Sequence, residues 1–328
     1  MSCFNMLTNI KLKKDISHNK INGKEIVMKF TRKEFLKTGA LITGGVLIQG
    51  HKFLYRTQKK VSGFKTVRDN VGVYTERGGT IGWYAGEDAV VMIDSQFPDS
   101  AKNFMTGLQE KTERRIKRFF NTHHHGDHTS GNIYIKDFAD KMIAHERCVE
   151  LQKKNYGNDP NKPQTYADST FEKEWREELG SETVSAKYFG PAHTGGDAVI
   201  HFEKANIAHV GDLVFNKTFP FIDSNGGGSV ANWSKVVDAV TKYYSNDTLF
   251  ICGHAASDDM IIATKSDLVS MRDYLSALVD FVSKGITNGK TKEEIASAAA
   301  IPGFENLKER WDGARKMNLE KTYDELKK

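Results

Sequence analysis

Four histidines and one aspartate within six residues constrain the fold of this chain more than any other feature. They lie in the segment NTHHHGDHTSGN (121–132), which directly follows a short apolar run, 116–120, with the pattern of a strand. The preceding strand and the interleaved glycine and aspartate distinguish this segment from an incidental histidine cluster. The sequence therefore predicts a strand that ends in a metal-binding turn.

The spacing within this run predicts two separate metal positions. Side chains two residues apart on an extended segment point the same way, so His123 and His125 can reach one ion. The glycine turn that follows redirects Asp127 and His128 towards a second position. We expect His124, which lies between the first two, to point elsewhere.

Further ligands are expected from three other places in the chain, because this run alone cannot complete the coordination of two ions. His193 is at the centre of a turn-rich loop that follows a predicted strand. Asp212 and His254 each stand just past the end of an apolar strand. The three cysteines form no C-x-x-C pair, so we expect histidine and carboxylate ligands.

The order of the predicted elements indicates an α/β fold in which strands followed by a helix occur twice. This repetition predicts two mixed sheets packed together and covered by helices on the outside, a four-layer αββα sandwich. Strands are expected at 71–74, 80–84, 89–93, 116–120, 184–189, 198–203, 205–210 and 249–252. Helices are expected at 100–113 (with Asp99 or Ser100 as its N-cap), 231–244, 266–284, 292–300 and 306–326.

The motif H-x-H-x-D-H, followed by a separated His, Asp and His in that order, resembles the metallo-β-lactamase superfamily of metal-dependent hydrolases over about 71–270. The resemblance implies a first metal bound by His123, His125 and His193, and a second bound by Asp127, His128 and His254, with Asp212 bridging the two. It also implies that Asp94, at the end of a predicted strand, supports the site from outside.

The resemblance implies a hydrolase in which two Zn²⁺ ions and a bridging hydroxide cleave an ester-like bond of a small molecule, with Asp127 and Asp212 as catalytic carboxylates; Fe or Mn could replace zinc. The bond is a thioester, lactone, β-lactam or phosphodiester, in a substrate that is anionic or contains a carbonyl group. The best-known broad-spectrum β-lactamases have a cysteine where Asp212 stands, so the pattern is closer to glyoxalase II-type thioester hydrolases and lactonases, and to several phosphodiesterases. Cys252 is expected to be a buried core residue.

Two other classes of function are compatible with the same residues. One is an iron-dependent redox enzyme of this fold, similar to the sulfur dioxygenases, since His and Asp ligands accept iron. The other is a non-catalytic metal-binding module, although the complete ligand set argues against it.

The net charge is divided unevenly along the chain. Residues 1–60 contain 13 Lys and Arg against 3 Asp and Glu, whereas the remaining residues contain 34 against 39. The body is therefore mildly acidic, and we expect no binding of nucleic acid.

Within this basic leader, Arg32-Lys33 and the uncharged 13-residue run 38–50 resemble a degenerate twin-arginine export signal, for which Met28 is a natural start. The run is too short for a stable membrane span. We expect a periplasmic or exported protein, with a cytoplasmic one as the alternative.

The remaining segments complete the predicted organisation. The leader, 1–60, is followed by a hydrolase domain, 61–270, and by a C-terminal helical extension, 271–328. Loop 219–229 is expected either to contact the substrate or to form a simple turn, and 155–165 to be a surface excursion near the site. We expect structural roles for His145, His201 and His209 and packing roles for Trp83, Trp175, Trp233 and Trp311.

Overall fold

The computed structural model describes residues 62–328 and the two short segments 20–21 and 24–25. In the leader, β1 (Lys20–Ile21) pairs antiparallel with β2 (Lys24–Glu25). The predicted export signal at Arg32-Lys33 and the run 38–50 lie outside the described residues. Among the described residues, no helix is both long enough and apolar enough to cross a bilayer.

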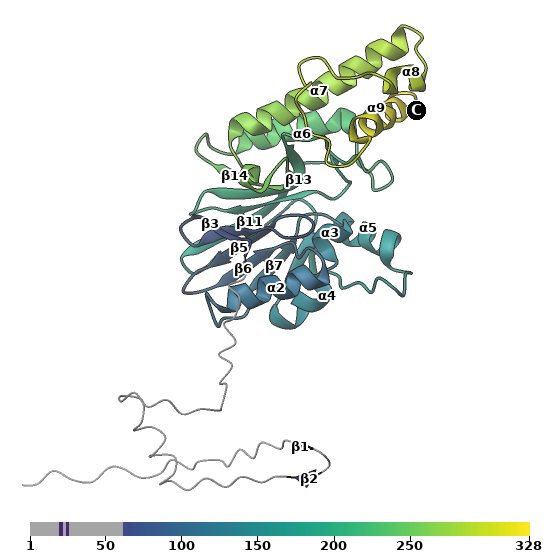
Figure 1. Ribbon diagram of the computed structural model, residues 1–328. Coiled ribbons are helices and arrows are strands. Elements are labelled where there is room, and N and C mark those ends of the chain that lie inside the picture. The colour runs from purple at the N-terminus through teal and green to yellow at the C-terminus, as the bar shows by residue number, and fades with distance from the viewer. Residues whose placement is uncertain (1–19, 22–23, 26–61) are drawn as a thin grey trace, which may run out of the picture. The chain divides into compact units, whose positions relative to one another are not determined.

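Two mixed sheets form the centre of the body, which is one compact unit from Lys59 to Lys328 (Figure 1). The first sheet has its strands in sequence order: β3 (Phe64–Arg68), β4 (Val71–Tyr74), β5 (Ile81–Ala85), β6 (Val90–Ile93), β7 (Arg118–Asn121), β8 (Met142–His145) and β9 (Ser169–Phe171). The second sheet does the same: β10 (Glu174–Leu179), β11 (Glu182–Tyr188), β12 (Ala198–Phe202), β13 (Ile207–Asn216), β14 (Leu249–Ala255) and β15 (Ile262–Ala263).

Alternation of side chains along β6 explains the layering on the first sheet. Val91 and Ile93 point into the core between the two sheets, and Val90 and Met92 point to the opposite face. There they pack against Phe104 and its neighbours on α2 (Pro98–Gln109). Both faces of β6 are therefore buried, one under the second sheet and one under α2. This explains why its sequence is a continuous apolar run rather than an alternation of apolar and polar residues.

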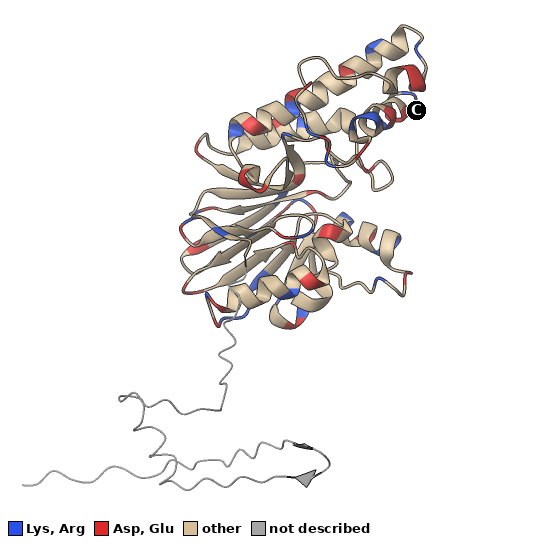
Figure 2. Cartoon of the chain, viewed as in Figure 1, with Lys and Arg blue, Asp and Glu red and all other residues tan. Residues whose placement is uncertain are grey.

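The outer face of the second sheet is covered by α6 (Val230–Tyr243), α7 (Lys265–Thr287), α8 (Lys292–Ala296) and α9 (Ala314–Leu326), as Figure 1 shows. Their apolar residues share one core cluster with β13 and β14. Lys and Arg lie beside Asp and Glu along the exposed side of α7, as Figure 2 shows, and Arg272 pairs there with Asp238 at 3.1 Å. The four-layer αββα sandwich predicted from the sequence is confirmed.

Several predicted boundaries were wrong. The helix expected from residue 100 begins at Pro98 with Phe97 as its N-cap, because proline is well suited to the first helical turn. Residues 306–313 are not helical, and α8 ends at Ala296. α7 runs through residue 270, and the later helices pack in the same core cluster as the second sheet; the predicted division into domains stays a prediction.

The remaining short helices connect the strands: α3 (Gly126–Thr129), α4 (Asn132–Ile135), η1 (Lys136–Phe138), α5 (Glu146–Tyr156) and η2 (Asp258–Met260). The sequence analysis missed α5 together with β3, β8, β9 and β10. Two of these strands, β3 and β10, are half exposed and rich in charge, so they lack the apolar run that marks a buried strand.

Candidate metal centre

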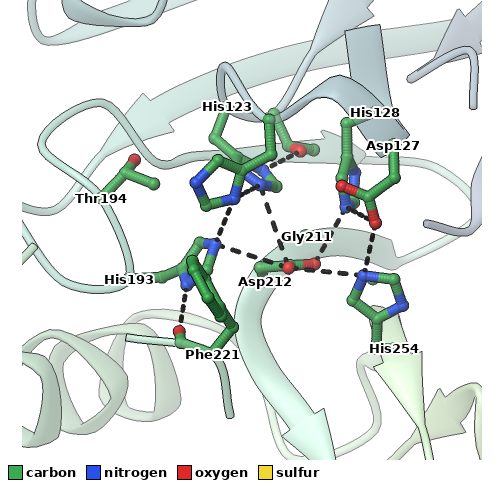
Figure 3. Close-up of polar contacts among 12 residues, drawn as sticks. His123, Asp127, His128, His193, Thr194, Gly211, Asp212, Phe221 and His254 are labelled. Atoms are coloured by element: carbon green, nitrogen blue, oxygen red, sulfur yellow. Dashed lines mark hydrogen bonds and ion pairs between the residues drawn. The ribbon is translucent and has the colours of Figure 1, made fainter. Parts of the chain in front are cut away.

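The seven predicted ligands lie together, as Figure 3 shows for six of them. Two groups are formed, and within each group one ligand atom of every residue lies within 4.8 Å of the others. The first group contains His123, His125, His193 and Asp212, and the second contains Asp127, His128 and His254. Residues from the β7 end, α3, the loop after β11, β13 and β14 thus meet at one place.

Asp212 and His254 are not past the ends of strands, as the sequence analysis had predicted. Both lie inside strands, because β13 continues to Asn216 and β14 to Ala255. The two strands are parallel, and their register shifts on both sides of Gly211. This irregularity turns the Asp212 side chain towards the histidines.

Two glycines allow this arrangement. Gly211 has φ +51°, a left-handed conformation that residues with a Cβ rarely adopt. At Gly253, a Cβ atom would lie 2.0 Å from Oδ1 of Asp212. The close approach of β14 to the Asp212 carboxylate therefore requires glycine at 253.

In the first group, each imidazole donates one N–H outward. His193 Nδ1 donates to the Phe221 carbonyl oxygen (2.8 Å), and His125 Nε2 donates to Asp223 Oδ2 (2.9 Å). The Thr122 hydroxyl donates its one hydrogen to Asp94. Its oxygen can therefore only accept from His123, whose Nδ1–H is the donor (3.0 Å). These partners leave a lone pair on the other nitrogen of each ring.

The three lone-pair nitrogens face one another. His125 Nδ1 lies 3.1 Å from His123 Nε2 and 3.0 Å from His193 Nε2. Nitrogens bound at 2.0–2.1 Å to one tetrahedral zinc would be about 3.3 Å apart. Burial lowers the pKa of His123 well below its usual range and that of His193 to about 3, so neither ring relieves the contact by taking a proton. A bound cation would convert this repulsive contact into a favourable one.

In the second group, His128 Nδ1 is 2.7 Å from Asp94 Oδ2, so Asp94 contacts this ring from outside the group. His128 Nε2 lies 3.2 Å from Asp212 Oδ1, and both atoms are buried without a hydrogen-bond partner. Burial would lower the pKa of His128, but Asp212, Asp127 and Asp94 together hold it well above its usual value. The surroundings of this ring thus favour a positive charge, which a metal ion would also supply.

Asp212 contacts both groups. Its Oδ2 lies 3.5 Å from Nε2 of His193 and 3.5 Å from Nε2 of His254, and its Oδ1 faces His128. Burial alone would raise the pKa of Asp212, but the surrounding histidines, His254 first among them, hold it well below its usual range. Burial would also raise the pKa of Asp127, but nearby histidines, His128 first among them, lower it. Both carboxylates are therefore ionised, and the donor set fits two divalent cations.

Residues that the sequence analysis did not single out extend this network. Asp223 accepts from His125 and, through Oδ1, from the Gly226 N–H (2.8 Å), which closes a turn in the loop 219–229. His124 points away from the first group, as predicted, with Nε2 2.8 Å from Asn155 Nδ2 and 3.4 Å from Asp223. A carboxylate that orients a ligand histidine is common in metal sites, but its position in the sequence carries no local signal.

A cavity of about 340 Å³ opens beside the two groups. It is lined by His125, Gly126, Asp127, Tyr156, Asp212, Phe215, Phe221, His254, Arg310 and Trp311. Phe221 belongs to the loop 219–229, and Tyr156, the last residue of α5, belongs to the segment 155–165. Both segments that were expected near the site therefore reach the cavity. Trp311 packs against the core cluster of the second sheet and its helices, as expected, and it also lines the cavity.

The other flagged histidines have structural contacts. His209 Nε2 donates to the Thr80 carbonyl (3.1 Å), and His145 caps α5 by accepting from the Arg147 N–H. The His201 ring packs edge-on against Tyr244, with centroids 4.8 Å apart.

A family model described as the metallo-beta-lactamase superfamily matches residues 74–285. The chain belongs to this superfamily. Its relatives include proteins named metallo-beta-lactamase type 2 from Elizabethkingia meningoseptica (23% identical, covering 68% of this chain and 83% of the relative) and from Bacillus cereus (25% identical, covering 64% and 82%). The resemblance drawn from the histidine motif is thereby confirmed, and the chain is a superfamily hydrolase.

Solved structures share the fold. A metallo-beta-lactamase from Pontibacter korlensis superposes with a TM-score of 0.57 at 15% identity and covers 65% of this chain and 98% of its own. A sec-alkylsulfatase from Pseudomonas sp. gives a TM-score of 0.64 at 16% identity and covers 80% of this chain but only half of its own.

Proposed function

We propose that this superfamily member is a hydrolase with two divalent cations, zinc in the first instance, that cleaves an ester-like bond. His123, His125 and His193 would bind the first ion and Asp127, His128 and His254 the second. The single observation that carries the proposal is the position of Asp212, whose carboxylate lies 3.5 Å from His193 of the first group and 3.2 Å and 3.5 Å from His128 and His254 of the second. A carboxylate so placed suits a bridging ligand.

When bound, the ions would supply Lewis acidity and lower the pKa of water from about 15.7 towards ~7. The chain's own residues would orient the reactants. The Asp127 side chain lines the cavity and is 30% exposed, while His254 holds its Oδ2 at 3.0 Å. We propose that this carboxylate orients the attacking water and takes up its proton.

The proposed substrate is a small molecule with a thioester, lactone, β-lactam or phosphodiester bond. An aspartate at position 212 and the absence of a thiolate among the proposed ligands favour the other three classes over the β-lactams. Cys252 lies in the core cluster between the second sheet and its helices, fully buried, and does not belong to either group. The relatives are named for β-lactams, so that class belongs in any test.

A hydrolysis screen of the zinc-loaded protein over these four bond classes, with the apoprotein as control, tests the proposal. Asp212→Ala and His193→Ala should each reduce turnover by orders of magnitude while the fold is retained. His201→Ala on β12, outside both groups, is the matched control and should keep full activity. Near-wild-type hydrolysis by either metal-loaded site variant would refute the assignment, as would an oxygen-consuming, iron-dependent activity in place of hydrolysis.

We also propose that the protein is exported. Arg32-Lys33 and the uncharged run 38–50 support this proposal. The N-terminal mass of the protein from its native source, together with fractionation of the cells, tests it.

A further inference from the structure

A segment outside the family match supplies part of the cavity wall. The match ends at residue 285, but Arg310 and Trp311 line the cavity beside Asp127 and His254. The superfamily match therefore contains all the proposed metal ligands and lacks two of the residues that line the cavity. Arg310 is the one arginine or lysine among the lining residues, and Trp311 adds a further aromatic ring to those of Tyr156, Phe215 and Phe221.

Backbone hydrogen bonds hold this segment in place. Lys308 forms a parallel bridge with Thr218, in the stretch that directly follows β13 and Asp212. The Lys308 carbonyl accepts from the Phe219 N–H (3.1 Å) and from the Thr218 hydroxyl (2.6 Å), and the Lys308 N–H donates to the Lys217 carbonyl (3.2 Å). Arg310 and Trp311 follow two and three residues after this anchor, so their position at the cavity is tied to the strand that carries Asp212.

The guanidinium of Arg310 has no carboxylate partner within the part of the chain that the structure describes. The adjacent Glu309 contacts Arg315 (3.3 Å) and accepts from the Gly313 N–H (2.9 Å) instead. In contrast, Arg272 on α7 is paired with Asp238 and Asp273. Arg310 is thus a cation at a cavity wall whose donors are free to meet a ligand.

Apolar surface lies beside this cation. The Trp311 ring packs edge-on against Phe221, with centroids 6.3 Å apart and an interplanar angle of 62°. Phe221 is 41% exposed although it is large and apolar, and its ring also contacts His125 of the first group at 5.6 Å. One wall of the cavity therefore runs from a proposed metal ligand over two aromatic rings to a guanidinium.

We propose that Arg310 and Trp311 form the recognition subsite for an oxyanion on a substrate with an apolar body. The reacting bond of the substrate would lie at the two groups of proposed metal ligands. Its apolar body would lie against Phe221 and Trp311, and its oxyanion would accept from the Arg310 guanidinium. A guanidinium donates two parallel hydrogen bonds to a carboxylate or to a sulfonate, which gives both affinity and orientation. The inference rests on the proposed function, and it restricts the substrate to molecules with a second, non-reacting anionic group.

Binding of non-hydrolysable probes tests this inference separately from turnover. The zinc-loaded full-length protein is titrated calorimetrically with 4-phenylbutyrate, 3-phenylpropane-1-sulfonate and the neutral 4-phenylbutanamide. We expect at least one anion to bind about tenfold more tightly than the amide, and Arg310→Ala to remove this preference. The two anions distinguish recognition of a planar carboxylate from that of a tetrahedral sulfonate.

Two further variants serve as comparisons. Arg272→Ala removes an arginine from α7 outside the cavity and should bind all three probes like the wild type. Trp311→Ala should weaken all three probes by a similar factor, because it removes apolar contact area and no charge. Arg310→Gln keeps hydrogen-bond donors and should bind the anions with intermediate affinity.

Equal affinity of wild type and Arg310→Ala for the anions would overturn the inference, because the anions would then be held by the metal ions alone. Equal affinity of the wild type for anions and amide would overturn it as well. Neither result bears on whether the protein hydrolyses a bond. Conversely, a negative hydrolysis screen would refute the proposed function and leave the measured anion preference of the cavity intact.

Discussion

Gly253→Ala tests whether the position of the Asp212 carboxylate controls the metal centre. The substitution adds one methyl group, whose carbon would lie 2.0 Å from Asp212 Oδ1 and 2.9 Å from the Gly211 carbonyl carbon. Real Cβ atoms essentially never approach a neighbour closer than 3.0 Å, so Oδ1 must retreat by about 1 Å. Oδ1 is the atom that faces His128 Nε2 at 3.2 Å, and this displacement would disrupt its bridging position.

A misplacement of about 1 Å in a catalytic constellation can reduce the rate by about 10²-fold, and overpacking of this kind costs typically 1–3 kcal/mol of folding free energy. We therefore expect Gly253→Ala to fold, to lose about two orders of magnitude in kcat/KM and to bind fewer than two zinc ions per chain. Circular dichroism, elemental analysis of zinc and hydrolysis of the substrate found in the screen measure the three quantities.

The matched control is Gly285→Ala on α7, where a Cβ would lie 2.6 Å from Ile295 Cδ1, outside the site. It also adds one methyl group against a close neighbour, so it should change stability without changing zinc content or turnover per folded molecule. Wild-type kcat/KM and two tightly bound zinc ions in Gly253→Ala would refute the role given to Asp212.

Three further predictions concern Asp223, the bound metal and the two buried cysteines. Asp223→Asn removes the charge that orients His125 and should weaken zinc binding or activity by about 10–100-fold, measured by competition with a chelating dye. Removal of metal with a chelator should lower the melting temperature, since an ion present at 1,000 times its Kd contributes about 4 kcal/mol per site; an unchanged Tm would contradict a metal centre. Burial raises the pKa of the Cys148 and Cys252 thiols, so at pH 8 the native protein should leave both unlabelled by a thiol reagent, whereas in urea both should react, as peptide mapping would show.

Much of the candidate centre could be predicted because its densest part is local. The run 123–128 carries its geometry within six residues, since a strand end and a glycine turn fix where neighbouring side chains point. His193, Asp212 and His254 were predicted from their order along the chain, which the superfamily pattern constrains. The layers were predicted because burial on both faces of a strand leaves a continuous apolar run, as in β6.

Contacts between distant segments could not be predicted, because no local pattern records them. Asp223 orients His125 across 98 residues, and the Phe221 carbonyl fixes the His193 tautomer across 28. Asp212 was placed beyond its strand because a polar residue after an apolar run usually marks a strand end; here the parallel pairing with β14 continues the strand through it.

By itself the sequence determined the superfamily, the alternation of layers and the identity of the residues that form the two groups. The tertiary structure alone decided which nitrogen of each imidazole turns inward and which segments line the cavity. The physical reason is that periodicity and spacing act over a few residues, whereas the partner of a ring N–H depends on how distant strands and loops pack. Arg310 and Trp311 show this most clearly, since the pairing of Lys308 with Thr218 and the packing of Trp311 on the core bring them to the cavity from a distant part of the chain.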